Sequence, residues 1–248
     1  MSRDDWDAAT YDRIADPQTR WGAEVLDRLE LAGNERVLDA GCGSGRVTEL
    51  LLARVPRGSV VALDASPSML EEARKRLGRK GRVEFVEADL GRPLPIDGPV
   101  DAVFSTATFH WIDDHEALFR NLAAVVRPGG RLVAQCGGSG NLASVWEAVR
   151  AVDPTRSTTK RFEGPDDTAR RLQAAGFVEV LVWLTDAPTP LEPGEPLETF
   201  LATVTLRHHV EGLPPDERLA FARAVAANLP RPELDYVRLN ILAARAPA

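Results

Sequence analysis

Short apolar runs alternate with amphipathic segments along the first three quarters of the chain. The apolar runs have the length of buried strands and cover 36–40, 59–63, 83–87, 100–105, 131–135 and 177–184. Helical patterns lie between them at 46–54, from Ser66-Pro67 onward, from Asp113 or Asp114 to about Val126, and at 166–175. Such alternation predicts a parallel sheet with crossover helices. A last strand is expected at 236–245, and it can pair in either direction.

Two local features refine this pattern. In the helix at 46–54 the spacing puts Val47, Leu50 and Leu51 on one face. Before the strand at 131–135, the segment Pro128-Gly-Gly130 is expected to form a turn.

Two segments lie outside the alternation. Residues 1–32 contain a predicted helix with Trp21, Val25 and Leu29 spaced four apart. Residues 186–235 begin with a proline-rich stretch and continue as helical patterns broken at Pro214-Pro215. Because this second segment lies between the last two strands, we interpret it as an insertion into a single domain that spans residues 1–248.

Composition limits the partners. The chain has 248 residues, 44% of them hydrophobic, and a formal net charge of −7. A negative charge disfavours nucleic acid as a partner, because affinity for phosphates depends on Lys and Arg. Two cysteines, Cys42 and Cys136, indicate a reducing compartment, and we expect no metal site. Without an apolar signal segment or membrane span, a cytoplasmic monomer or homodimer that does not contact membranes is expected.

Glycines dominate the turn between the first strand and its helix. The segment Asp39-Ala-Gly41-Cys-Gly43-Ser-Gly45 lets the backbone approach a ligand, and the following helix start offers free N–H groups. Many nucleotide sites share this feature. Arg46 stands where the dinucleotide fingerprint has its last glycine, which argues against a nicotinamide dehydrogenase. Asp39 would repel a pyrophosphate but attract a cationic sulfonium or ammonium.

Two further carboxylates follow the next two predicted strands at equal intervals. Asp64 ends the second strand, where a carboxylate can accept hydrogen bonds from both ribose hydroxyls of a nucleotide; the alternative is a turn or capping aspartate. Asp89 follows the third strand and can accept from an adenine amino group, with Ala88 and Leu90 beside the ring; the alternative is a surface loop.

This ordered set resembles the class I S-adenosylmethionine-dependent methyltransferases over residues 36–136, including the segments 101–105 and 127–131. The resemblance implies a Rossmann-like α/β fold with a seven-stranded, mostly parallel sheet and helices on both faces. It implies S-adenosylmethionine as cofactor and a cofactor-binding core at 33–136. It also implies lid segments at 1–32 and 186–235. The cofactor-binding residues that it implies are Asp39, Gly41, Gly43, Gly45, Asp64, Ala65, Met69, Ala88, Asp89, Leu90 and Thr106.

A closer likeness connects the segments 107–115, 122–135 and 239–245 with the trans-aconitate 2-methyltransferase branch, which makes methyl esters of small polycarboxylic acids. It implies O-methylation of a carboxylate on a small molecule. The chain departs from that branch at His110, where glutamine is usual, and at 136–141. A phenolic or other secondary metabolite methylated on oxygen or nitrogen, and a cofactor-binding protein without catalysis, remain as alternatives.

Several residues are candidates for the acceptor side. His110 acts either as a general base or as a lining residue, and Trp111 either forms a wall or cage or anchors the core. Arg207 offers a fork for a carboxylate, or pairs with Glu211 on a helix surface. The predicted catalytic residues are His110 and Arg207, and the predicted substrate contacts are Trp6, Tyr11, His110, Trp111, Arg207 and His208.

Overall fold

The computed structural model describes residues 16–78, 81–156, 158, 160–210 and 212–247. Its strands are β1 (Arg36–Ala40), β2 (Ser59–Asp64), β3 (Val83–Glu87), β4 (Val100–Thr106), β5 (Val126–Gly137), β6 (Phe177–Asp186), β7 (Thr189–Pro190), β8 (Glu233–Leu234) and β9 (Val237–Arg245). Its helices are α2 (Asp16–Leu26), α3 (Arg46–Arg54), α4 (Pro67–Leu77), α5 (His115–Val125), α6 (Ala143–Val152), α7 (Pro165–Ala174), α8 (Glu195–Phe200), α9 (Arg207–Val210) and α10 (Pro215–Ala227), with a 3₁₀ turn η2 (Phe109–Trp111) and a π-helical turn η3 (Leu201–Thr205). Among the described residues, no helix combines the length and apolar character that a membrane crossing requires.

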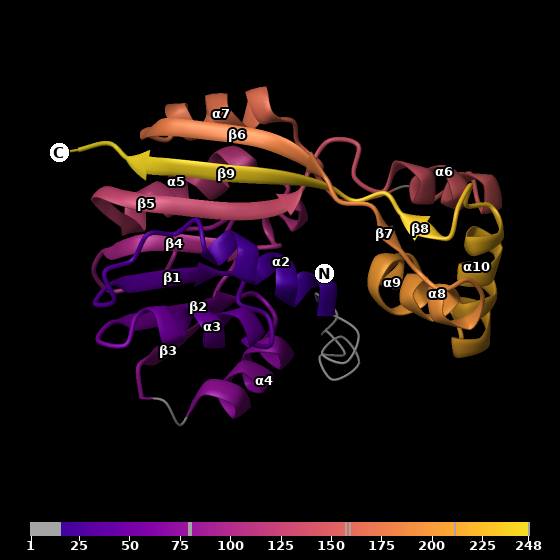
Figure 1. Cartoon of the computed structure of the whole chain (residues 1–248), viewed down its shortest axis with the longest axis horizontal. Helices are drawn as coiled ribbons and strands as arrows, with labels where there is room; N and C mark the ends of the chain where they lie inside the picture. The colour runs from indigo at the N-terminus through magenta and orange to yellow at the C-terminus, as the bar shows by residue number, and fades with distance from the viewer. Residues whose placement is uncertain (1–15, 79–80, 157, 159, 211, 248) are drawn as a thin grey trace.

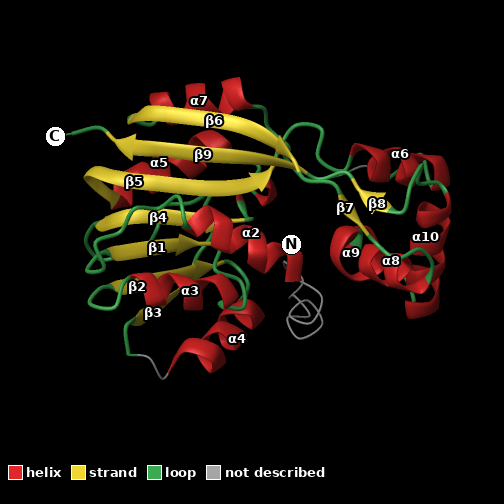
Figure 2. Ribbon diagram, in the orientation of Figure 1, coloured by secondary structure: helices red, strands yellow, loops and turns green. Residues whose placement is uncertain are grey.

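Seven strands form one sheet in the order β3-β2-β1-β4-β5-β9-β6 (Figure 2). The first five are parallel, and β9 is antiparallel to both β5 and β6. The strand order reverses between β1 and β4, and open α/β sheets bind ligands beyond the carboxyl ends of strands at such a reversal. The expected Rossmann-like, mostly parallel sheet is confirmed.

Helices cover both faces of the sheet (Figure 1). On one face, α2, α3 and α4 bury a layer that includes Val37, Val60 and Phe104. On the other, α5 and α7 bury a layer that includes Leu38 and Val103. Neighbouring residues of a strand point to opposite faces, so burial of both faces explains why the strands read as continuous apolar runs.

Most element boundaries agree with the sequence patterns, but β5 begins at Val126, well before the expected start at Arg131. Val126 pairs with Val100, and the register then shifts before Arg131 pairs with Ala102. Gly129 has a positive φ of 72° within this irregular stretch. The Pro-Gly-Gly segment therefore bends the strand from within instead of preceding it.

The expectation for α3 is wrong at Leu50, whose side chain is 38% exposed. The buried positions of this helix are Thr48, Leu51 and Leu52. Thr48 lies on the sheet side because its hydroxyl donates a hydrogen bond to the buried carboxylate of Asp39. A polar residue thus occupies a position on the inner face, and Leu50 turns toward solvent.

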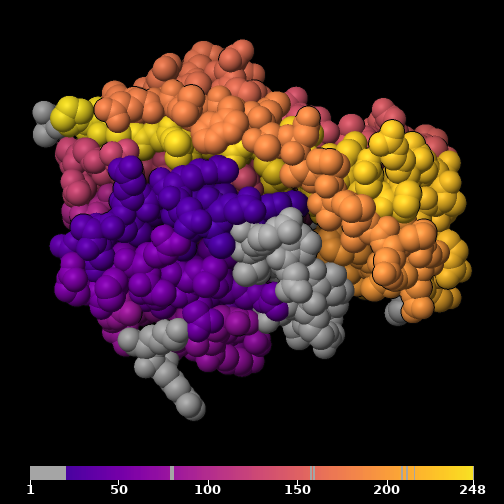
Figure 3. Space-filling model, viewed as in Figure 1, coloured from indigo at the N-terminus to yellow at the C-terminus, as the bar shows by residue number. Residues whose placement is uncertain are grey.

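A helical module, formed by α6, α8, η3, α9 and α10 with the small β7–β8 sheet, lies beyond the carboxyl ends of the parallel strands (Figures 1 and 3). Its apolar core includes Trp146, Phe200 and Val225. The expected insertion at 186–235 omits α6, which the chain reaches directly after β5 and which packs against α10. Trp21 of α2 contacts the same core through the ring of Tyr236, with centroids 5.2 Å apart.

We expect Leu51→Ala to destabilise the protein far more than Leu50→Ala, because Leu51 is fully buried under the sheet and Leu50 is not. The buried substitution leaves a cavity and costs about 2–5 kcal/mol, whereas the exposed one costs below about 1 kcal/mol. Urea unfolding of the two variants measures the difference. Equal losses would show that both leucines are buried in solution, against the orientation of α3 described above.

Candidate functional site

The glycine loop begins where β1 ends, between β2 and β4. The N–H groups of Gly41 and Cys42 both donate to the carbonyl oxygen of Leu63 at 2.8 and 2.9 Å. Gly41 has a φ of +88°, and a Cβ at this position would overlap the side chain of Thr108. The turn therefore requires glycine, both for its backbone conformation and for the space it leaves.

The rest of the loop leads into α3 and is open at Gly43. Gly43 has a φ of +54°, and no atom of the described residues lies within 4 Å of the place where its Cβ would stand. Gly45, with a φ of +81°, precedes the first residue of α3 without a side-chain cap. A glycine turn with open space at Gly43, followed directly by a helix N-terminus, is suited to a polar ligand.

Asp39 is a buried carboxylate behind this loop. Its side chain is 2% exposed, and the hydroxyl of Thr48 donates a hydrogen bond to it at 2.7 Å. Burial raises the pKa of Asp39 to about 7, the Thr48 hydrogen bond opposes this rise, and the charge of Asp64 adds to it. The negative charge is therefore poorly compensated within the described residues, and a cationic ligand would favour it.

Asp64 ties the glycine loop to the start of α4. Its carboxylate accepts from the N–H of Gly43 and from the N–H of Ser66, both at 2.9 Å. Ser66 itself caps α4, because its hydroxyl accepts from the N–H of Met69 at 3.3 Å. Asp64 is thus not the helix cap, but its bond to the N–H two residues on is the turn role that the sequence left open, and its carboxylate also bonds to the glycine loop.

The other predicted cofactor residues gather at the ends of β2 and β3. Ala88 donates its N–H to the carbonyl oxygen of Asp64 at 3.1 Å, and Asp89 accepts from the N–H of Gly91 at 2.9 Å. Leu90 and Met69 are buried, and Ala65 is half-buried. The structure brings these residues to the same edge of the sheet, and their contacts with an adenine ring stay a prediction.

On the opposite side of the loop, β4 ends at Thr106. The hydroxyl of Ser105 donates to the carbonyl oxygen of Ala40 at 2.6 Å, and that of Thr108 donates to the carbonyl oxygen of Gly41 at 3.3 Å. These bonds connect the end of β4 and the turn after it to the end of β1 and the glycine loop. His110 and Trp111 follow at once in η2, so both lie at the carboxyl end of the sheet.

His110 is buried and already bonded. Its Nδ1 accepts a hydrogen bond from the N–H of Gly137 at 3.3 Å, and its ring stacks on Phe162 with centroids 5.8 Å apart. Burial lowers the pKa of His110 well below its ordinary value, and the positive charges of Lys160 and Arg238 lower it further. The imidazole is therefore neutral at pH 7, and Nδ1 is occupied, which argues against a base role at that nitrogen.

Two cations that sequence reasoning missed lie near His110. The ammonium of Lys160 lies over the ring of Trp111, 4.4 Å from its centroid. The guanidinium of Arg238 lies 4.8 Å from the ring centroid of Trp21, and its Nε donates to Gln135 at 3.2 Å. Neither has a local sequence signal, because Lys160 follows a polar stretch and Arg238 is one charge within an apolar strand.

Of the remaining predicted substrate contacts, the structure describes the side chain of Arg207 only. Arg207 begins α9, two residues before His209, whose ring lies 5.0 Å from that of Trp146. Trp6, Tyr11 and Glu211 lie outside the described residues, as does the side chain of His208. The structure therefore places Arg207 in the helical module and leaves its role and that of His208 as predictions.

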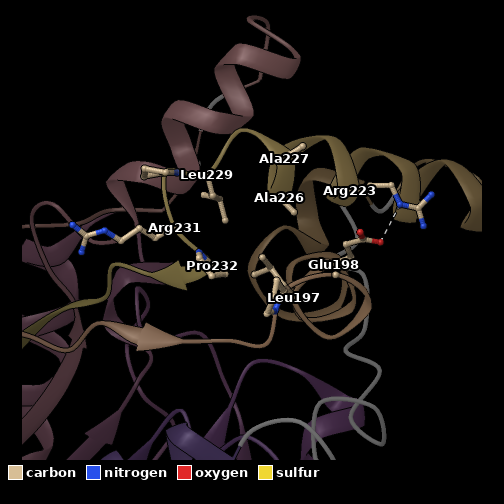
Figure 4. Close-up of a pocket in the computed structure, with 11 residues that line it drawn as sticks. Leu197, Glu198, Arg223, Ala226, Ala227, Leu229, Arg231 and Pro232 are labelled. Atoms are coloured by element: carbon tan, nitrogen blue, oxygen red, sulfur yellow. Dashed lines mark hydrogen bonds and ion pairs between the residues drawn. The ribbon is translucent and has the colours of Figure 1, made fainter.

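A separate groove of about 350 Å³ lies on the helical module (Figure 4). Leu197, Ala226 and Leu229 give it an apolar wall, and Glu198 pairs with Arg223 beside it at 3.1 Å. All of its lining residues come from α8, α10 and the loops next to them. This groove is therefore not part of the candidate site at the sheet.

Known proteins share both the sequence and the fold of this chain. Residues 37–130 match the model of a methyltransferase domain family. Over 191 residues the chain is 39% identical to a trans-aconitate 2-methyltransferase of Methylobacterium nodulans, covering 74% of this chain and 68% of that one. Over 232 residues it is 32% identical to its counterpart in Methylobacterium radiotolerans, covering 89% and 87%. The chain belongs to the trans-aconitate 2-methyltransferase branch of the class I methyltransferases. It is an S-adenosylmethionine-dependent enzyme.

Solved structures agree on the fold of this methyltransferase. Phosphoethanolamine N-methyltransferase 2 of Haemonchus contortus, in complex with phosphomonomethylethanolamine and S-adenosylhomocysteine, superposes with a TM-score of 0.66 at 17% identity, over 97% of this chain and 57% of that one. The YcgJ protein of Bacillus subtilis superposes with a TM-score of 0.65 at 18% identity, over 92% and 99%.

The described residues fit S-adenosylmethionine. The open side of Gly43 leaves room beside the loop, the carboxylate of Asp64 accepts from the N–H of Gly43, and the carboxylate of Asp39 is buried behind the loop. The negative charge of Asp39 suits a ligand with a sulfonium and an ammonium group and disfavours a pyrophosphate, and Asp64 suits a ribose. The resemblance in the glycine loop and the geometry of the loop thus favour the same cofactor.

We expect Asp39→Asn to stabilise the ligand-free enzyme by an amount that grows with pH. Below about pH 4 the carboxyl is protonated in the folded and the unfolded chain alike. As the pH rises, unfolded Asp39 ionises first, while the folded residue, with its pKa raised to about 7, keeps its proton. The wild type therefore loses up to about 1.4 kcal/mol per pH unit relative to the variant, until the folded residue also ionises.

Urea unfolding of wild type and Asp39→Asn between about pH 4 and about pH 9 measures this difference. Asp97→Asn, which removes an exposed carboxylate from the loop before β4, serves as control. A difference between wild type and Asp39→Asn that does not change with pH would show that Asp39 has an ordinary pKa in the folded enzyme.

Proposed function

We propose that the enzyme transfers a methyl group to a carboxylate oxygen of a small polycarboxylic acid, as the name of its relatives, trans-aconitate 2-methyltransferase, describes for them. The supporting observation is a separation of charge across the site. Asp39, Asp64 and Asp89 lie on the side of β1, β2 and β3, whereas Lys160 and Arg238 lie beyond β4 and β5.

The acidic side suits the cationic cofactor. We assign the ribose to Asp64, the adenine amino group to Asp89, and the faces of the adenine ring to Met69 and Ala65. Gly41 and Thr106 are assigned to the methionine amine, with Asp39 behind them. Bound S-adenosylmethionine supplies an electrophilic methyl group, which an acceptor oxygen takes while the sulfur keeps the bonding electrons and leaves as a neutral thioether.

The basic side suits an anionic acceptor. The guanidinium of Arg238 stays charged at all ordinary pH values, and Lys160 adds a second positive charge near His110. A carboxylate is ionised and nucleophilic at pH 7, so its oxygen needs orientation and not a base. This agrees with a neutral His110 whose Nδ1 is already bonded to Gly137.

The flanking segments complete this proposal. We assign residues 1–32 and the insertion at 186–235 to a lid over the acceptor, and we add α6 to it because α6 packs within the same module. A lid that excludes water strengthens the attraction between the cations and the acceptor carboxylates. Arg207 and His208 belong to this lid and are kept as acceptor contacts.

A phenolic acceptor is a second candidate, favoured by the aromatic rings around His110. Trp111 and Phe162 lie 5.2 and 5.8 Å from the imidazole, and such rings can hold a planar aromatic substrate. Against it, a phenol with a pKa near 10 needs a base. Nδ1 of His110 cannot serve as that base while it accepts a hydrogen bond from the N–H of Gly137.

We expect methyl transfer to trans-aconitate and related acids, and little or none to phenols and amines. Methyl-labelled S-adenosylmethionine with a panel of acids, phenols and amines measures it. Mild alkali releases the label from an ester but not from an aryl ether or a methylamine, so the product class can be read directly. Turnover confined to phenols or amines, with cofactor binding intact, would contradict the proposal.

A further inference from the structure

Lys160 lies between two tryptophans that come from separate parts of the chain. Its Nζ is 4.4 Å from the ring centroid of Trp111 in η2 and 5.8 Å from that of Trp146 in α6. A cation held against two indole faces gains from their quadrupoles, and the fixed rings also restrict where the ammonium can point. The side chain is half-buried.

No carboxylate among the described residues pairs with this ammonium. Glu163, which follows in the same loop, is engaged by Arg161 at 2.8 Å and by Arg171 at 3.0 Å. The backbone N–H of Lys160 donates to the hydroxyl of Thr158 at 3.1 Å, but its ammonium donates no hydrogen bond to any described residue. Burial without a counterion lowers the pKa of Lys160 to about 8. A partly buried cation without a counterion is unfavourable, and a bound anion would neutralise its charge.

A second donor in the same cluster is also unsatisfied. The indole N–H of Trp146 is buried and has no hydrogen-bond acceptor among the described residues. Ammonium and indole groups are donors only, so a ligand that satisfied both would have to offer acceptor oxygens. A carboxylate has two oxygens and a negative charge, and it meets both requirements.

The position of this cluster connects it with the reaction. Trp111 follows the end of β4 within five residues of Thr106, and the N–H of Arg161 donates to the carbonyl oxygen of His110 at 2.9 Å. Lys160 is therefore held beside η2, at the carboxyl end of the sheet.

We propose that Lys160 binds a non-reacting carboxylate of the acceptor, and that it thereby selects acids with at least two carboxylates over acids with one. This inference rests on the proposed function, because it assumes an acid as acceptor. The alternative is that Lys160 serves only to pack the loop between the two tryptophans.

The test compares wild type with Lys160→Met, which keeps the packing against the rings, and with Lys160→Arg, which keeps the charge. Lys75→Met, on the exposed face of α4, is the matched control. Steady-state kinetics are measured with trans-aconitate, a tricarboxylate, and crotonate, a monocarboxylate. Because one charge-assisted hydrogen bond is lost, Lys160→Met is expected to raise KM for trans-aconitate by about tenfold to hundredfold.

The expected pattern is specific. Lys160→Met raises KM for trans-aconitate at least tenfold more than KM for crotonate, and S-adenosylmethionine affinity is unchanged, whereas Lys160→Arg keeps KM for trans-aconitate within a few-fold of wild type. An unchanged KM for trans-aconitate, or an equal loss with both acids, would overturn the selective role of Lys160 and favour packing alone.

The two proposals fail in different ways. If wild type methylates no acid, the proposed function fails, and calorimetry of trans-aconitate binding to the enzyme saturated with S-adenosylhomocysteine then decides the role of Lys160. Binding that Lys160→Met weakens at least tenfold supports a carboxylate site. No binding to wild type, or equal binding to both, refutes it.

Discussion

The backbone at the end of β1 turns so close to the segment after β4 that no side chain fits at Gly41, and the rest of the site depends on this turn. The close approach lets Thr108 bond to the carbonyl oxygen of Gly41. It also lets two loop N–H groups reach Leu63 at the end of β2. Three strand ends are thereby held together, with the predicted cofactor residues on one side and the predicted acceptor residues on the other.

Buried charge is the second constraint. Asp39 is held at the inner end of the loop with Thr48 as its hydrogen-bond donor, and burial disfavours its ionised form. Lys160 is half-buried on the other side with no carboxylate among its described neighbours. Each group is costly in the ligand-free enzyme, and each is suited to a ligand of the opposite charge. A cationic methyl donor would compensate the charge of Asp39, and an anionic acceptor would compensate the charge of Lys160.

The acceptor side is assembled from distant parts of the chain. Trp111 comes from the turn after β4, Trp146 from α6, Lys160 from the loop before α7, and Arg238 from β9. Of these residues, Trp146 belongs to the apolar core of the helical module, which also contains Trp21. A solved structure with the same fold carries another substrate in its name, so the fold by itself does not determine the acceptor.

The sequence by itself determined the fold class, the strands near the glycine loop and the ordered carboxylates, because each depends on a local period or a glycine within a few residues. Only the tertiary structure decided that Thr48 and not Leu50 faces inward, since the buried carboxylate of Asp39 draws it there. It also decided that α6 joins the module and that Lys160 meets Trp111. Those contacts join residues far apart in the chain, and no local pattern encodes which distant side chain a lysine in a polar loop will meet.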